Sequence, residues 1–317
     1  MRRRSWKAPG PRTGRWLAAV LVVVVMTLAS AGSAWAQRRG RHRVLTIPDD
    51  VKVTRGVVYG LGGGRELRLD LYSPRSPQGR CPAVVFLHGG GWRSGSPGQF
   101  APQSIMLAEK GYVCACPEYR LSGEARFPAA VEDAKSAVRW LRAEAERLGV
   151  DTQRIAIAGG SAGGHLAAMI AVTGPGLFEG QGGHADQSSA VQLAVLFNPV
   201  TDMIALGQAH GSGRMLLEFL GKPYEEAPDL WAKASPVTYV TEDDPPTLVL
   251  HGTADQTVPF AQSQAFVTKL QAAGVEAELF AAEGAGHGFF NRPPWLQRTF
   301  EAMLDFLDEH FRAQAAE

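Results

Sequence analysis

The sequence predicts an α/β fold in which helices cover a mostly parallel β-sheet. From about residue 44 onward, short apolar runs alternate with amphipathic stretches, and no repeat of fixed length is visible. The 317 residues are 45% hydrophobic and 20% charged, a composition that can bury a substantial core. We therefore expect a single folded domain over residues 51–317.

The individual elements follow from local patterns. Apolar runs with strand character lie at Val51–Tyr59, Glu66–Tyr72, Ala83–Leu87, Tyr112–Cys116, Ile155–Ala158, Val191–Phe197, Thr247–Leu250 and Ala277–Ala281. Helical spacing of apolar residues lies at Pro128–Leu148, Ala162–Val172, Ala261–Ala273 and Trp295–Phe311. Glycines at 62–64 predict a hairpin turn between the first two strands, and Gly149 and Gly274 are helix-ending glycines.

Residues 201–245 break the alternation. The segment is long, contains Gly and Pro, and carries large apolar side chains, including Trp231. An insertion of this kind between two core strands favours a small lid over a site. A purely structural surface excursion is the alternative.

The N-terminus has the pattern of a secretory signal peptide. Six basic residues precede the apolar run Leu17–Ala29, and small residues follow it up to Ala36, where an Ala-Trp-Ala site predicts cleavage. We therefore expect residues 1–36 to be removed, residues 37–50 to form a flexible basic start, and the protein to be secreted or periplasmic. The alternative is a retained membrane anchor, but the apolar run is shorter than the roughly 20 residues of a spanning helix.

The net charge becomes informative once the signal peptide and the basic start are counted separately from the rest of the chain. The whole chain has a net charge of +1, whereas the body beyond the four arginines at 38–43 holds 22 basic and 31 acidic residues. An acidic body argues against nucleic acid as a partner.

The three cysteines predict no disulfide framework and no zinc site. Cys114 and Cys116 point the same way along one strand and suit buried apolar positions, although a bridge from Cys81 to one of them is possible. No cysteine or histidine spacing is typical of a structural zinc site.

Gly159-Gly-Ser161-Ala-Gly163 follows an apolar strand and opens a helix, which is the context of the GxSxG nucleophile elbow. A serine hydroxyl needs a base, and that base needs an orienting group. His287 follows the last strand and Asp255 the strand before it, so both lie on loops at carboxyl ends of strands. We interpret Ser161, His287 and Asp255 as a catalytic triad. Asp255 could instead cap the following helix, and Asp202 is the competing position for the acid.

His88-Gly-Gly-Gly-Trp92 follows the strand Ala83–Leu87 and matches the HGGG motif that accompanies this elbow. We expect the amides of Gly90, Gly91 and Ala162 to form an oxyanion hole. His88 is expected to orient its loop. Trp92 and Trp231 are candidate walls of the substrate pocket, although large aromatics more often simply pack.

Five motifs together resemble the α/β-hydrolase esterases: HGGGW at 88–92, EYRLSGEARFPAAVEDAKSAVRWLR at 118–142, RIAIAGGSAGGHLAA at 154–168, HGTADQTVP at 251–259 and GAGHGF at 284–289. Within this fold the chain is most similar to the hormone-sensitive-lipase-like group and to the feruloyl and acetylxylan esterase-like enzymes of bacteria. The resemblance spans about residues 50–312.

That resemblance implies an eight-stranded sheet, no cofactor, and hydrolysis of small-molecule or carbohydrate esters through an acyl-enzyme. EYRLSGEARFP stands where lipase-like members tend to have YRLAPEHPFP, which favours the carbohydrate-esterase branch and acetyl or feruloyl esters. The motifs at 251–259 and 284–289 also resemble prolyl-oligopeptidase-like peptidases, so a peptidase or amidase using the same triad is the alternative function. A non-catalytic binding protein on the same fold is a third hypothesis for the function.

Overall fold

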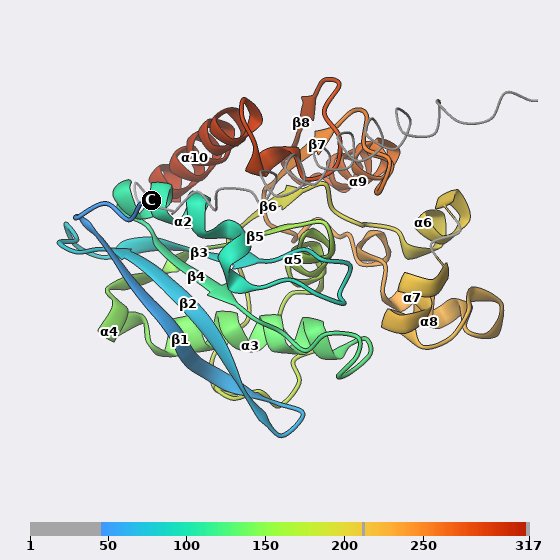
Figure 1. Cartoon of the computed structure of the whole chain (residues 1–317), viewed down its shortest axis with the longest axis horizontal. Helices are drawn as coiled ribbons and strands as arrows, with labels where there is room; N and C mark the ends of the chain where they lie inside the picture. Colours follow the sequence, from blue (N-terminus) through green and yellow to red (C-terminus); the bar gives the residue numbers. More distant parts are fainter. Residues whose placement is uncertain (1–45, 211–212, 315–317) are drawn as a thin grey trace, which may run out of the picture. The chain divides into compact units, whose positions relative to one another are not determined.

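The computed structural model describes residues 46–210 and 213–314. Within these residues, eight strands form one sheet (Figure 1). From one edge to the other, the strands are β1 (Val51–Gly62), β2 (Arg65–Pro74), β4 (Val113–Pro117), β3 (Cys81–Leu87), β5 (Val150–Gly160), β6 (Leu193–Phe197), β7 (Thr247–Gly252) and β8 (Ala277–Ala282). β2 pairs antiparallel with β1 and with β4, and the other neighbours pair in parallel. The predicted eight-stranded, mostly parallel α/β architecture is thereby confirmed.

Helices cover both faces of the sheet. The α-helices are α2 (Ala101–Glu109), α3 (Ala129–Ala143), α4 (Ala145–Leu148), α5 (Ala162–Thr173), α6 (Met203–His210), α7 (Gly213–Leu220), α8 (Pro228–Lys233), α9 (Phe260–Ala272) and α10 (Trp295–Gln314). Short 3₁₀ turns are η1 (Pro97–Phe100), η2 (Tyr224–Glu226), η3 (Pro236–Thr238) and η4 (Phe289–Asn291). Buried side chains of α3, α5 and α9 pack on one face, and those of α2 and α10 on the other.

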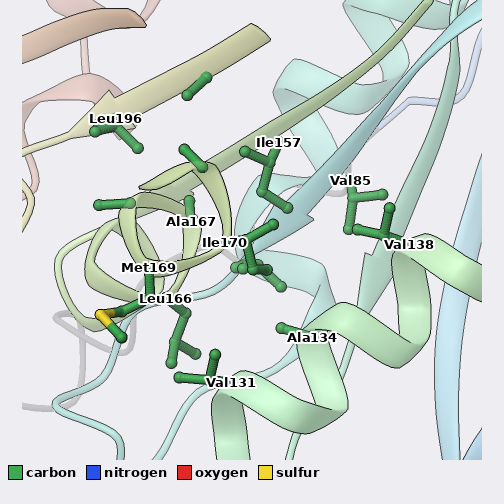
Figure 2. Packing of buried hydrophobic residues seen from close by; sticks show 14 of the residues in the cluster. Val85, Val131, Ala134, Val138, Ile157, Leu166, Ala167, Met169, Ile170 and Leu196 are labelled. Carbon is green, nitrogen blue, oxygen red and sulfur yellow. The ribbon is translucent and has the colours of Figure 1, made fainter. Parts of the chain in front are cut away.

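The core follows the two-residue period of the central strands. Alternate residues of β3 belong to opposite apolar clusters, Val85 to the one beneath α3 and α5 and Phe86 to the other. Figure 2 shows the first cluster, in which Val85, Ile157 and Leu196 from the sheet lie among Val131, Ala134, Val138, Leu166, Ala167, Met169 and Ile170 from the two helices. Burial on both faces explains why these strands are continuous apolar runs.

Two helices differ from the sequence prediction. The stretch predicted as one helix over 128–148 divides at Glu144 into α3 and α4 and ends at Gly149, which has a φ of +69°. Helix α2 was not predicted, because Pro97, Gly98 and Pro102 give its start the composition of a loop. Proline at a first helical turn removes no intrahelical hydrogen bond, so the helix forms in spite of Pro102.

The described residues within 201–245 form α6, α7 and α8 with the turns η2 and η3, and Figure 1 shows the three helices grouped together at the right of the view. Leu216, Phe219 and Trp231 in this group are buried. The insertion is therefore helical and has apolar side chains packed into the same cluster as α3 and α5.

The cysteines are free, and the alternative bridge from Cys81 is not formed. Cys81 belongs to the apolar cluster on one face of the sheet, whereas Cys114 and Cys116 belong to the cluster on the opposite face. A bridge would have to cross the sheet, so all three thiols act as small buried apolar groups.

The predicted signal peptide and most of the basic start lie outside the described residues. Among the residues that the structure describes, none of the helices is both long enough and apolar enough to cross a membrane.

Candidate active site

Ser161 lies in a sharp turn between the last residue of β5 and the first residue of α5. Its φ of +57° and ψ of −120° are strained for a residue with a side chain, at a cost on the order of 1–3 kcal/mol. The turn requires close approach of its flanks, because a Cβ on Gly163 would lie 2.0 Å from the carbonyl oxygen of Leu87. The glycine after the elbow therefore allows α5 to pack directly on β3.

The side chains of Ser161, His287 and Asp255 form a hydrogen-bonded chain. The Oγ of Ser161 lies 2.9 Å from Nε2 of His287, and Nδ1 of His287 lies 2.7 Å from Oδ2 of Asp255. A carboxylate can only accept, so Nδ1 carries the proton and Nε2 is left to accept from the serine hydroxyl. The arrangement has the geometry of a nucleophile, a base and an orienting acid.

Asp255 is held on both of its oxygens. Oδ1 accepts the backbone N–H groups of Thr257 at 2.7 Å and Val258 at 3.0 Å, and Oδ2 also lies 3.2 Å from Nε2 of His251. Burial alone would raise the pKa of this carboxyl, but the hydrogen bonds from His251 and His287 outweigh it and hold the pKa well below its usual range. Asp255 therefore stays ionised beside the imidazole. It does not cap α9, which begins at Phe260.

The glycine loop after β3 lies next to Ser161 and lines the same cavity. Gly90 and Gly91 have φ values of +121° and +62°, and neither uses its N–H in a backbone hydrogen bond within the described residues. Ala162 is the first residue of α5, so its N–H has no acceptor one turn earlier in the helix. Three amide donors are thus available beside the serine.

His88 and Gln99 support this loop. The buried His88 ring stacks on Tyr119 with ring centroids 4.2 Å apart, and burial lowers the pKa of the imidazole. The hydroxyl of Tyr119 donates to the carbonyl of His88 at 2.7 Å, and the side-chain oxygen of Gln99 accepts the N–H of Gly89. His88 therefore has the environment of a neutral, loop-orienting residue.

Trp92 reaches the cavity but is buried. Its indole N–H donates to Nδ1 of His165 at 3.2 Å, and its ring stacks on Phe219 at 4.5 Å between centroids. Nε2 of His165 in turn donates to the carbonyl of Ala234 at 2.8 Å. Trp92 and His165 thus connect the glycine loop, α5 and the end of α8.

Trp231 does not line this cavity, contrary to the expectation from sequence. It is 4% exposed, its indole N–H donates to the carbonyl of Lys222 at 3.0 Å, and it borders a separate hollow between α6 and η2. The reason is local packing, because its six-membered ring lies against Gly207 of α6.

Asp202, the competing candidate for the acid, has no hydrogen bond to His287 among the contacts of the described residues. Its Oδ1 accepts the N–H groups of Ile204 at 2.9 Å and Ala205 at 3.0 Å, which caps the start of α6.

The cavity around Ser161 has a volume of about 250 Å³. Sequence reasoning did not single out several of its residues, which come from four separate segments: Gln99, Asn198, Met215, Phe290 and Asn291. Asn198 was open to prediction, because it directly follows β6 and so lies at the same edge of the sheet as Ser161. Among the described residues, no group of three or more His, Cys, Asp or Glu is placed to hold a metal ion.

The fold and this arrangement of side chains are those of the α/β-hydrolase class. The family profile of BD-FAE matches residues 69–270. The chain is 34% identical over 266 residues to esterase LipQ of Mycobacterium tuberculosis, covering 80% of this chain and 62% of LipQ. It is 32% identical to an ethyl acetate hydrolase of Pseudomonas putida, covering 76% of this chain and 77% of that protein.

Solved structures agree with these sequence relatives. A propionate-bound esterase of Thermogutta terrifontis is similar with a TM-score of 0.70 and 38% identity, covering 82% of this chain and 94% of that one. The chain spans about three fifths of the length of LipQ and of two other mycobacterial relatives. The chain belongs to the BD-FAE family of α/β-hydrolases.

Proposed function

We propose that this protein is a carboxylic ester hydrolase that works through a Ser161–His287–Asp255 triad and an acyl-enzyme. The observation that carries the proposal is the continuous hydrogen-bonded chain from Ser161 Oγ to Asp255, set beside three available amide donors in one cavity. Names of relatives support the same reaction class, since they include esterases and an ethyl acetate hydrolase.

In the acylation step, the Oγ of Ser161 attacks the ester carbonyl carbon while Nε2 of His287 takes the hydroxyl proton. The carbonyl oxygen becomes negative, and the amides of Gly90, Gly91 and Ala162 are our oxyanion donors. Collapse of this intermediate breaks the bond to the alcohol oxygen, which receives the proton from His287. Asp255 keeps the proton on Nδ1 and stabilises the imidazolium.

Deacylation repeats these steps with water. His287 removes a proton from the water, the resulting oxygen attacks the acyl carbon, and Ser161 leaves as the alcohol after regaining the proton. The acid is released and the resting state is restored, so the reaction needs no redox partner or cofactor.

The cavity supports a small, uncharged ester as substrate. Its volume lies just below the range of about 300–1,000 Å³ that is usual for drug-sized ligands. Of the titratable residues that the structure describes, only His287 lines it. The other lining side chains are apolar, such as Val200 and Phe290, or neutral and polar, such as Asn291. We propose that the substrates are short-acyl esters or carbohydrate-linked esters of the acetyl or feruloyl type, and the sequence motifs favour the carbohydrate-linked class.

We also propose that the protein is exported and that residues 1–36 are its signal peptide. The support is the order of a basic stretch, the apolar run Leu17–Ala29 and the small residues before Gln37.

Hydrolysis of p-nitrophenyl acetate tests the proposed chemistry. Ser161→Ala is expected to lower kcat/KM by several orders of magnitude and to abolish labelling by a fluorophosphonate probe, because the nucleophile is gone. Ser76→Ala, an exposed serine far along the chain from the cavity, is the control and should match the wild type. Near-wild-type turnover by Ser161→Ala contradicts the triad.

A substrate panel tests the class of bond. Acetylated xylan, methyl ferulate and p-nitrophenyl esters of increasing acyl length should rank the acyl and alcohol preferences. Faster cleavage of peptidyl substrates than of short-chain esters would instead identify a peptidase or amidase.

A further inference from the structure

Asn198 is a buried polar residue of the site that has no role in the proposed acylation and deacylation steps. It directly follows β6, its side chain is completely buried, and it lines the cavity around Ser161. Its φ of +36° lies in the left-handed region, which residues other than glycine seldom adopt. A strained, buried polar residue beside a nucleophile calls for a functional explanation.

The side chain of Asn198 lies against His287. Its Nδ2 is 3.2 Å from Nδ1 and 3.4 Å from Nε2 of the imidazole. Both ring nitrogens already have partners, since Nδ1 donates to Asp255 and Nε2 faces Ser161. An atom almost equidistant from the two nitrogens therefore contacts the ring itself and does not replace either bond.

The other end of the same amide has no partner. Oδ1 of Asn198 is buried, and no donor reaches it within the described part of the chain. A buried acceptor left unsatisfied costs about 1–3 kcal/mol, so its retention needs a compensating role. The carboxamide can exchange its two ends by rotation about one bond, which would bring the oxygen to the ring.

We propose that Asn198 is a positioning residue for His287, and that its unpartnered oxygen stabilises the imidazolium formed during acylation; this inference rests on the proposed triad. His287 lies between Gly286 and Gly288 and its side chain is 26% exposed, so its own loop gives the ring little support. Asn198 supplies that support from the rigid sheet. Its oxygen gains a cationic partner only while His287 carries the extra proton.

A competing explanation is that asparagine is present only because it tolerates the left-handed backbone. Glycine tolerates that backbone better, so Asn198→Gly separates the two explanations. If the backbone is the whole reason, glycine should be neutral or stabilising. If the amide acts on His287, glycine should damage the proton transfers.

Two acetate esters provide the readout. Ethoxide is a poor leaving group that needs the proton from His287, whereas p-nitrophenolate leaves without it. We expect Asn198→Gly to lower kcat/KM for ethyl acetate about tenfold more than for p-nitrophenyl acetate, because general acid catalysis contributes most to the poor leaving group. Asn198→Asp keeps an oxygen against the ring and should recover most of the ethyl acetate rate.

Two control variants separate loss of the amide from a general effect of glycine and from unfolding. His184→Gly likewise introduces glycine at a residue with left-handed backbone, in the loop before β6, and should leave both rates unchanged. Asn198→Leu fills the space without an amide and replaces the glycine variant if that variant is unfolded by circular dichroism. Equal losses on the two esters, no loss, or failure of Asn198→Asp to recover activity would overturn the inference. A wild type that hydrolyses neither ester would refute the proposed function itself.

Discussion

At the residue scale, the carboxylate of Asp255 organises the site. It accepts two backbone N–H groups on one oxygen and faces two imidazoles with the other. Its neighbour His251 is itself fixed, because Nδ1 lies 2.6 Å from the hydroxyl of Ser263 and Nε2 lies 3.0 Å from the carbonyl of Val258. The orientation of His287 therefore depends on a chain of contacts that reaches α9.

Exchanging Asp255 for asparagine should disable the proposed triad while preserving its shape. We expect Asp255→Asn to lower kcat by about 10⁴, because the amide no longer holds the catalytic tautomer of His287. Asp202→Asn is the matched comparison, since it keeps a capping side chain at α6 and should retain kcat. A variant pair with the opposite ranking, measured on p-nitrophenyl acetate, would assign the acid to Asp202.

At the scale of elements, His165 joins three parts of the fold. It extends from α5, accepts the indole N–H of Trp92 and donates to Ala234. Complete burial lowers the pKa of this imidazole to about 4. The ring is therefore neutral in the folded state at pH values where an unfolded histidine, with a pKa near 6.5, is charged.

This difference predicts a pH-dependent stability. The contribution of neutral His165 is complete above about pH 6.5 and is lost progressively as the pH falls towards 4, by up to about 3 kcal/mol. His165→Gln can still accept and donate but cannot titrate, so its free energy of unfolding in urea should fall less between pH 7 and 4.5. His184→Gln should keep the slope of the wild type. Parallel slopes for His165→Gln and wild type would show that His165 does not drive the effect.

Helix α7 brings the insertion to the cavity. Met215 lines the cavity, and a Cβ on Gly91 would lie 2.7 Å from its sulfur. Leu217 on the same helix is 41% exposed and borders the separate hollow instead. From these positions we propose that the insertion acts as a lid in which Met215 limits the space above the glycine loop.

Shortening Met215 should enlarge the cavity. We expect Met215→Ala to raise kcat/KM for p-nitrophenyl butyrate and hexanoate relative to acetate, since removal of the thioether makes room for a longer acyl chain. Leu217→Ala is the control and should keep the acyl-length profile of the wild type. An unchanged profile in Met215→Ala would mean that the insertion does not limit this part of the site.

At the scale of the whole molecule, the sheet assembles a site from distant segments. Ser161 follows β5, Asn198 follows β6, and Asp255 and His287 follow β7 and β8. Because these strands are parallel neighbours, their carboxyl ends lie side by side along one edge of the sheet. Strand order alone therefore brings together residues separated by more than a hundred positions.

Export is the remaining prediction at this scale. Secretion by a bacterial host should yield a mature chain whose N-terminal residue is Gln37, because the Ala-Trp-Ala site ends at Ala36. Ala36→Asp should block cleavage and leave a larger, membrane-associated precursor. N-terminal sequencing and fractionation measure both results. A wild-type protein that stays with the membrane at full length would establish a retained anchor.

Sequence patterns predicted the strands, the main helices and the loops that carry Ser161, Asp255 and His287. They succeeded there because each motif directly follows an apolar strand, and strand ends in a parallel sheet share an edge. They did not find α2, whose start resembles a loop, or the division between α3 and α4 at Glu144. At these two places the intrinsic helix preferences of the residues are weak, and tertiary packing determines where the helices form and end.

The sequence by itself determined the α/β class, the order of the elements and the candidate catalytic residues, because each has a local pattern of period or motif. Only the tertiary structure decided which side chains meet across segments. In the folded chain Asn198 lies against His287, and Trp231 borders a hollow separate from the cavity. Cys81 and Cys114 lie on opposite faces of the sheet. The physical reason is that side-chain direction in turns and insertions is set by long-range packing, which no short stretch of sequence encodes.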